Sequence, residues 1–247
     1  MLLVAYSLVR GGIRWRCRSW RDEWLMAALG ITGGSLYFLT ENEALCYTNT
    51  TNVSLIVCSC PLVAALLVGL FYKSERLSRL QAVGMLIAAC GMAAVILNGH
   101  YVLRLSPVGD MLALGACLCW AVYTLLIIPA NKKYDPVFIN RKLFFYGLLT
   151  VVPYFVLFPQ PLPAGVLLRP QVVACLLFLG VVASCVCFLA WTWVIARLGA
   201  VVATSYVYVN PLSTIIVATL LLHEHVTPFF LLGTLLIILG MVLADRK

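Results

Sequence analysis

Two stretches of this sequence carry one pattern: NVSLIVCSCPLVAALLVGLFYKSERLSRLQAVGMLIAACGMAAVIL at residues 52–97, and TSYVYVNPLSTIIVATLLLHEHVTPFFLLGTLLIILGMVLA at residues 204–244. A shift of 150 residues aligns their prolines, and a shift of 149 aligns the residues after those prolines. The aligned pairs are Pro61 and Pro211, Glu75 and Glu224, Gly84 and Gly233, and Gly91 and Gly240. Self-similarity at a fixed offset predicts a duplicated structural unit.

The repeat extends outward from these stretches, because the same shift aligns Gly30 with Gly180. We predict two domains, an incomplete first repeat at 1–99 and a second repeat at 107–247. About 43 residues at the start of the second repeat have no counterpart in the first repeat. We therefore expect a ten-helix architecture without its first helix and part of its second. A genuine nine-span variant is the alternative.

The composition is that of a membrane protein: 63% of the 247 residues are hydrophobic, 11% are charged, and the mean hydropathy is +1.03. Because a helix needs about 20 residues to cross the hydrocarbon layer, the apolar runs predict eight spans. They are Trp24–Leu45, Val53–Tyr72, Leu80–Leu97, Pro107–Ile128, Leu143–Phe158, Val172–Ile195, Ala200–Leu222 and Phe229–Ala244. These runs are apolar on every side, so the predicted class is all-α.

The net charge is +8. The basic residues that produce it are concentrated in alternate loops and at the chain ends. One side holds Arg10, Arg14, Arg16, Arg18, Arg21, Lys73, Arg76, Arg79, Lys132, Lys133, Arg141, Lys142, Arg197, Arg246 and Lys247. Only Arg104 and Arg169 fall on the other. Basic loops stay in the cytoplasm, so we predict a multi-pass protein of the inner (plasma) membrane with a cytoplasmic C-terminus. This placement argues against nucleic-acid binding.

An odd number of helices in each repeat has a consequence for function. Five spans per repeat insert the two halves into the membrane in opposite senses, which makes an inverted repeat. Inverted repeats are typical of secondary transporters, where two opposed halves alternate around a site near the bilayer midplane.

Both quoted stretches resemble the closing helices of an EamA domain, and GDMLALGACLCWAVYTLL at residues 109–126 resembles its opening helix. The resemblance covers nearly the whole chain, twice. It implies the drug/metabolite transporter superfamily, with ten helices in two inverted five-helix halves that carry small metabolites such as amino acids or amines. The resemblance specifies the fold better than the substrate.

Glu41 is the leading candidate for substrate or proton binding. A carboxylate in hydrocarbon costs at least about 2.5 kcal/mol, so it faces the bundle interior, pairs, or takes a proton. Tyr37 lies one turn before it on the same helix. The alternatives are a residue at headgroup level or a hydrogen bond that packs two helices.

Other candidates come from the repeat and from polar residues inside spans. The shift of 150 places Trp191 opposite Glu41, where an indole could hold a cationic substrate; a tryptophan at headgroup level is the alternative. Prolines inside spans break helices, and polar side chains beside them turn inward. The predicted substrate-binding residues are Glu41, Tyr37, Asn52, Trp120, Tyr123, Trp191, Tyr206 and Asn210, with helix breaks at Pro61 and Pro211.

No motif indicates an enzyme, a cofactor or a metal. The sequence lacks a phosphate-binding glycine loop and an H-E-x-x-H pair, and its Cys-x-Cys pairs point about 200° apart on a helix. The expected partners are a small-molecule substrate and the lipid bilayer; the oligomeric state is open between monomer and homodimer. A membrane channel or a non-transporting partner subunit is the alternative function.

Overall fold

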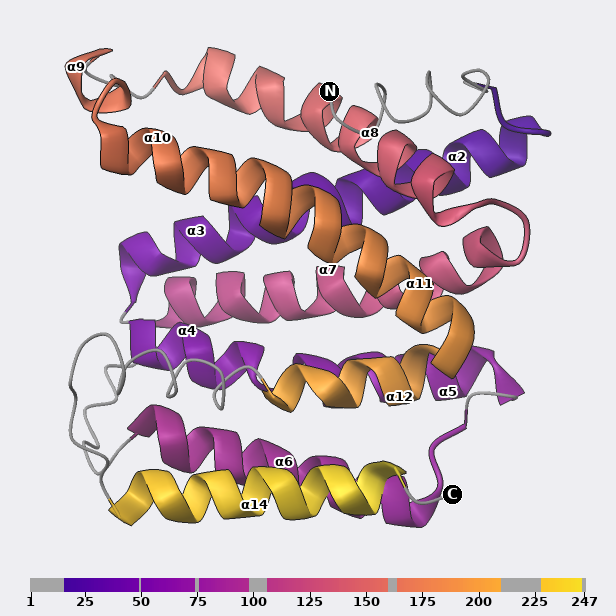
Figure 1. The fold of residues 1–247 in the computed structure, drawn as a ribbon, viewed down its shortest axis with the longest axis vertical. Helices are drawn as coiled ribbons and strands as arrows, with labels where there is room; N and C mark the ends of the chain where they lie inside the picture. Colours follow the sequence, from indigo (N-terminus) through magenta and orange to yellow (C-terminus); the bar gives the residue numbers. More distant parts are fainter. Residues whose placement is uncertain are drawn as a thin grey trace. The chain divides into compact units, whose positions relative to one another are not determined.

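The computed structural model describes residues 16–48, 50–73, 76–97, 106–159, 164–209 and 228–245. Every regular element in these ranges is helical (Figure 1). In chain order they are α2 Trp20–Leu29, η1 Gly30–Leu36, α3 Tyr37–Tyr47, α4 Thr50–Val57, α5 Cys60–Phe71, α6 Arg79–Leu97, α7 Pro107–Asn131, α8 Pro136–Leu157, α9 Ala164–Leu167, α10 Pro170–Leu177, η3 Phe178–Cys187, α11 Phe188–Leu198, α12 Ala200–Ser205, η4 Tyr206–Val209 and α14 Pro228–Asp245. The all-α prediction is confirmed.

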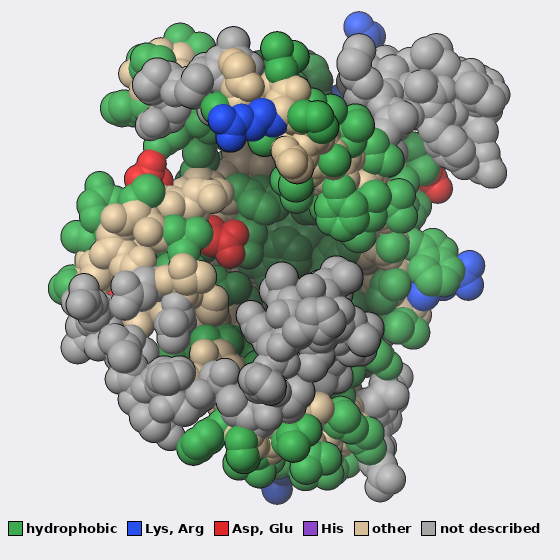
Figure 2. All heavy atoms as spheres, turned by 60° about the vertical axis from the view of Figure 1, so that its left-hand side comes forward, with side chains coloured by type: hydrophobic (Ala, Val, Ile, Leu, Met, Phe, Trp, Pro, Cys, Tyr) green, Lys and Arg blue, Asp and Glu red, His purple; other side chains and the backbone are tan. Residues whose placement is uncertain are grey.

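Four helical stretches in the described ranges are long and apolar enough to cross a membrane: Asn52–Phe71, Arg79–Leu97, Pro107–Asn131 and Pro170–Leu198. Each matches a predicted span to within a few residues. A fifth predicted span, Trp24–Leu45, is one helical path through α2, η1 and α3. On the face drawn in Figure 2, hydrophobic side chains cover most of the described surface and charged ones are few. The chain is a multi-pass membrane protein.

The placement of Arg141 and Lys142 in a loop is wrong, because both lie within α8 and are 6% and 5% exposed. The helix begins at Pro136, where the Asp135 side chain accepts a hydrogen bond from the Val137 amide at 3.0 Å. Lys142 forms an ion pair with Glu23 of α2. A hydropathy scale treats each charged residue as unfavourable and takes no account of an ion-pair partner. The predicted span therefore began at Leu143, whereas α8 begins at Pro136.

The repeat is visible in the local structure. The π-helical segments η1 and η3 interrupt two equivalent helical paths, and Gly30 of the first aligns with Gly180 of the second. α6 begins at Arg79 and α14 at Pro228, 149 residues later. A π-helical turn is rare. Its recurrence at the repeat offset supports duplication of the whole segment.

The chain divides into two compact units, residues 1–36 with 126–197 and residues 37–125 with 198–247. In the first unit, η1 and α2 lie against α8 (Figure 1). A Cβ at Gly30 would lie 2.5 Å from Tyr146 Cβ and 2.8 Å from the Leu143 carbonyl oxygen. Glycine is therefore required for this contact, since any side chain would separate the two backbones.

In the second unit, α6 and α14 lie side by side in opposite directions and cross at glycines (Figure 1). A Cβ at Gly84 would meet the Gly240 carbonyl oxygen at 2.5 Å, and one at Gly91 would meet that of Gly233 at 2.6 Å. Gly84 thus contacts the repeat equivalent of Gly91, and Gly91 that of Gly84. Such a reciprocal contact is what a two-fold axis produces, and it fits an inverted repeat.

Two helix starts are capped by side chains. The Ser106 amide donates to Asp110 Oδ2 at 3.2 Å while the Gly109 amide donates to Ser106 Oγ at 3.4 Å, at the start of α7. Ser78 and Gln81 exchange the same pair of bonds at 3.0 and 3.1 Å before α6. These capping boxes satisfy amides that the first helical turn leaves without partners.

Candidate functional site

Glu41 and Tyr37 meet on α3 in the second unit. Because they are four residues apart, their side chains share one face of the helix, and the Tyr37 hydroxyl donates to Glu41 Oε1 at 3.2 Å. Both side chains are half-buried. The carboxylate has a phenol as its hydrogen-bond donor.

An aromatic row continues from Tyr37 onto α7. The Tyr37 and Trp120 ring centroids lie 5.3 Å apart, and those of Trp120 and Tyr123 lie 5.2 Å apart, with tilted planes in both pairs. Tyr123 is fully buried. Four of the predicted residues, Glu41 with these three, therefore form one cluster in which a carboxylate is followed by a row of π-faces.

The interruption before Pro61 brings a second polar group to α7. α4 ends at Val57 and α5 begins at Cys60. In the turn between them, Ser59 Oγ donates to the Ile56 carbonyl at 2.6 Å and lies 3.8 Å from Cys117 Sγ. The Cys60 thiol lies near the Cys117 thiol. Cys117 precedes Trp120 by three residues on α7, so the thiols and the aromatic row share a region of that helix.

Tyr208 is a residue that the site prediction left out. It lies in η4, is fully buried, and its hydroxyl has no hydrogen-bond partner among the described residues. The hydroxyl is within electrostatic range of the Cys58, Cys60 and Cys117 thiols. Tyr206, which the sequence predicts instead, is 42% exposed. The shift of 150 pairs Tyr208 with Cys58 beside the helix break, which was the available signal.

The remaining predicted residues are distributed differently. Asn52 is buried in α4. Trp191 is half-buried in α11 of the first unit, so its pairing with Glu41 stays a prediction. Asn210 and Pro211 lie outside the described residues. In α12, which precedes η4, the Thr204 hydroxyl donates to the Val201 carbonyl at 2.9 Å, and the Ser205 hydroxyl donates to the Val202 carbonyl at 2.7 Å.

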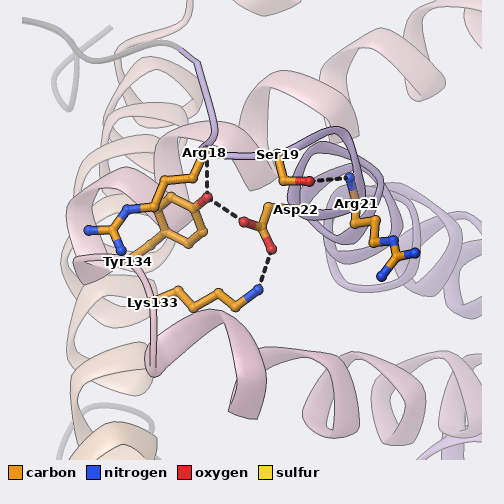
Figure 3. Close-up of polar contacts among 6 residues, drawn as sticks. All are labelled: Arg18, Ser19, Arg21, Asp22, Lys133 and Tyr134. Carbon is orange, nitrogen blue, oxygen red and sulfur yellow. Dashed lines mark hydrogen bonds and ion pairs between the residues drawn. The ribbon is translucent and has the colours of Figure 1, made fainter.

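A second polar cluster lies at the start of α2 in the first unit (Figure 3). Asp22 is buried and accepts from Lys133 Nζ at 2.6 Å and from the Tyr134 hydroxyl at 2.8 Å. The same Tyr134 oxygen accepts from the Arg18 amide at 2.8 Å. The hydrogen bonds from Lys133 and then Tyr134 lower the pKa of Asp22. This carboxylate stays charged and connects α2 to the loop between α7 and α8.

Glu23 makes the corresponding connection to α8. It pairs with Lys142, accepts from the Tyr146 hydroxyl at 2.5 Å, and accepts from the Cys17 amide at 3.3 Å. Partial burial alone would raise the pKa of Glu23, but hydrogen bonds from Cys17, Lys142 and Tyr146 outweigh it and lower the pKa to about 2. Burial, followed by the hydrogen bond to Glu23, raises the pKa of Cys17 to about 12.

In the described part of the chain, no group of three or more His, Cys, Asp or Glu side chains is arranged to hold a metal ion. Two polar clusters of the described residues contain carboxylates. One combines a carboxylate, thiols and aromatic rings in the second unit, and the other is an ion-paired start of α2 in the first.

Comparisons with known proteins agree with the fold. The chain is 28% identical over 253 residues to an uncharacterized transporter of Archaeoglobus fulgidus, covering 99% of this chain and 85% of that protein. It is 25% identical over 244 residues to a "probable terminal-alkyne amino-acid exporter" of Streptantibioticus cattleyicolor, covering 99% and 80%. One crystal structure superposes with a TM-score of 0.78 at 20% identity, covering 99% of this chain and 84% of that one, and this likeness concerns the fold alone.

The family assignment rests on two matched segments. The profile of the EamA-like transporter family matches residues 1–97 and again residues 107–244. Together the two matches leave only the connection between them and the last residues uncovered. The chain therefore belongs to the EamA-like transporter family.

Proposed function

We propose that this protein is a secondary transporter of small metabolites, such as amino acids or amines, that works by alternating access and is coupled to protons. The observation that carries the proposal is the Glu41 carboxylate, which accepts from Tyr37, the residue whose ring begins the row that continues to Trp120 and Tyr123. An intramembrane carboxylate is expensive to maintain and is by default a functional group. Membership of a transporter family supports the same conclusion.

The chemistry of the cluster suits a substrate with an ammonium group. Glu41 would pair with the ammonium, while the Trp120 face would attract the same cation through its π-electrons. Tyr123 would contact an apolar portion of the substrate. The carboxylate would hold a proton whenever it holds no substrate, so that the two compete for one site and exchange across the membrane. A relative described as an amino-acid exporter supports this substrate class.

The experiment is substrate flux into proteoliposomes, with labelled amino acids and amines tested in turn. We expect saturable flux that falls by about tenfold or more in Glu41→Gln, because a hydrogen bond to a charged group contributes about 1.5–3 kcal/mol. Glu43→Gln is the matched control, since it makes the same change two residues along α3 and should keep flux within about twofold. Equal losses in both variants would contradict the assignment of Glu41.

A channel and a non-transporting subunit predict different outcomes in the same vesicles. A channel gives flux that does not saturate and shows no counterflow when unlabelled substrate is placed inside. A non-transporting subunit gives no flux above empty vesicles. Acidifying one side should accelerate exchange if protons and substrate share Glu41, and an unchanged rate would remove proton coupling from the proposal.

We also propose that the protein lies in the inner membrane with its C-terminus in the cytoplasm. The exposed Arg16, Arg18 and Arg21 lie at the start of α2, and Lys73, Arg76 and Arg79 lie before α6 and at its first residue. The positive-inside rule assigns both groups to the cytoplasm. Labelling of single cysteines placed near Arg16 and at the C-terminus tests this, because both must be inaccessible to an impermeant reagent in intact cells.

A further inference from the structure

The start of α2 presents arginines and tryptophans together on the surface of the first unit. Arg16, Arg18 and Arg21 are exposed, and Trp20 and Trp24 are 82% and 73% exposed. We call these five residues the α2 patch. Tryptophan is enriched at the membrane–water interface, because its indole is amphipathic. The two exposed indoles are therefore suited to that interface.

The acids beside the patch are already neutralised. Asp22 is occupied by Lys133 and Tyr134, and Glu23 by Lys142 and Tyr146. Figure 3 shows the Arg18 and Arg21 side chains directed away from Asp22. Among the described residues, no carboxylate forms an ion pair with any of the three arginines. The cationic groups of the patch are therefore available to an external anion.

The spacing along α2 sets the depth of each group. Trp20 and Trp24 are four residues apart and share a face of the helix. Arg21 lies between them in sequence, within roughly 5 Å of Trp24 along the helix axis at about 1.5 Å per helical residue. Arg18 and Arg16 come before the helix starts, on the Trp20 side of it. If the indoles lie at the headgroup boundary, the guanidinium groups lie at the level of the lipid phosphates.

We propose that the α2 patch is a binding site for anionic phospholipids of the cytoplasmic leaflet. The guanidinium groups would hold the phosphate through paired N–H donors, which suit phosphate geometry better than an ammonium does. The indoles would contact the glycerol and the upper acyl chains. The ion pairs at Asp22 and Glu23 serve this site because they remove the negative charge that would repel the lipid.

The test is binding of fluorescent phosphatidylglycerol to the whole purified protein in a neutral detergent. A cation near an anionic lipid is worth about fivefold in affinity. We therefore expect the triple variant Arg16→Gln, Arg18→Gln, Arg21→Gln to lose roughly a hundredfold. The matched control is Lys73→Gln, Arg76→Gln, Arg79→Gln, which removes the same charge from three exposed positions in the second unit and should stay within about threefold.

Further arms separate the possible outcomes. The variant Arg16→Lys, Arg18→Lys, Arg21→Lys keeps the positive charge and should bind the lipid within about tenfold of the unchanged protein. Its binding would show that substitution at these three positions does not by itself prevent folding. Trp20→Ala with Trp24→Ala should weaken lipid binding without any change of charge. Equal losses in the patch and control triples would overturn the proposal in favour of bulk charge, and full competition by soluble glycerol phosphate would overturn it in favour of a free-phosphate site.

Discussion

The two π-helical segments of the first unit have equivalent positions in the repeat and opposite environments. In η1, a Cβ at Gly30 would lie 2.5 Å from Tyr146 Cβ of α8. In η3, a Cβ at the equivalent Gly180 would have no described atom within 4 Å. No residue of α10 or η3 is buried. A π-helical interruption can therefore occur both where another helix packs closely against it and where no described residue does.

The difference teaches that local sequence sets the helix type while a neighbouring helix sets the packing. Both segments carry small residues four apart, Gly30 with Gly34 and Gly180 with Ser184, which is the spacing that permits close helix contact. In the described chain only the first pair has α8 against it. The preceding helices differ as well, because Asp22 and Glu23 of α2 align with Val172 and Val173 of α10.

The largest expected effect comes from adding one methyl group at each glycine. Gly30→Ala should destabilise the protein by about 3 kcal/mol, because the new Cβ would overlap α8 backbone and side-chain atoms that cannot retreat. Gly180→Ala should be neutral or stabilise by up to about 1 kcal/mol, since alanine is the better helix former in open space. Thermal unfolding in detergent measures both.

The pair of alanine variants can break the comparison directly. A loss at Gly180 similar to that at Gly30 would mean that another helix covers η3 in the protein as it exists. Gly147→Ala is a useful companion, because its Cβ would approach Gly34 Cα at 3.2 Å from the α8 side of the same contact. It should destabilise, though by less than Gly30→Ala.

The next largest effect should come from Glu23 of α2, which aligns with Val173 in α10 and so has no equivalent carboxylate there. Glu23→Gln should cost about 2 kcal/mol at neutral pH, because it leaves the buried Lys142 without its counter-ion. The pKa of Glu23 is lowered to about 2, so its contribution is complete above the unfolded value of about 4.3 and is lost as the pH falls toward 2.

Unfolding of both proteins between pH 7 and pH 2 tests this linkage. The stability difference between the unchanged protein and the Glu23→Gln variant should be constant down to about pH 4.3 and should vanish near pH 2. Val173→Ala at the equivalent place in α10 should change stability by less than about 0.5 kcal/mol at any pH. A difference that disappears already at about pH 5, above the unfolded pKa, would show that the ion pair does not hold α2 to α8.

The smallest effect is expected at Ser35, whose hydroxyl lies 2.7 Å from Thr150 Oγ1 of α8. Ser35→Ala should cost about 1 kcal/mol, a typical value for one hydrogen bond, because Thr150 keeps its bonds to the Tyr146 and Gly147 carbonyls. Cys185→Ala at the equivalent position of η3 should have no measurable effect. Equal changes in the two variants would remove the distinction at this end of the segments.

Part of the candidate site could be predicted from the sequence. Helical spacing alone places Tyr37 one turn from Glu41, and Trp120 one turn from Tyr123, so each pair could be read as neighbours. Their meeting across α3 and α7 could not, because it depends on the packing of two helices distant in the chain. The full burial of Tyr208 and the exposure of Tyr206 could not be predicted for the same reason, because burial depends on which helices pack around η4.

The sequence by itself determined the apolar helices, the duplication at 149–150 residues and the family, because hydropathy and repeated spacing can be read along the chain. Only the tertiary structure decided which glycines bring backbones together, that Lys142 is buried with Glu23, and that η1 is covered while η3 is not. The physical reason is that a charge or a small residue sets what a helix tolerates, whereas the partner that satisfies it comes from a distant segment.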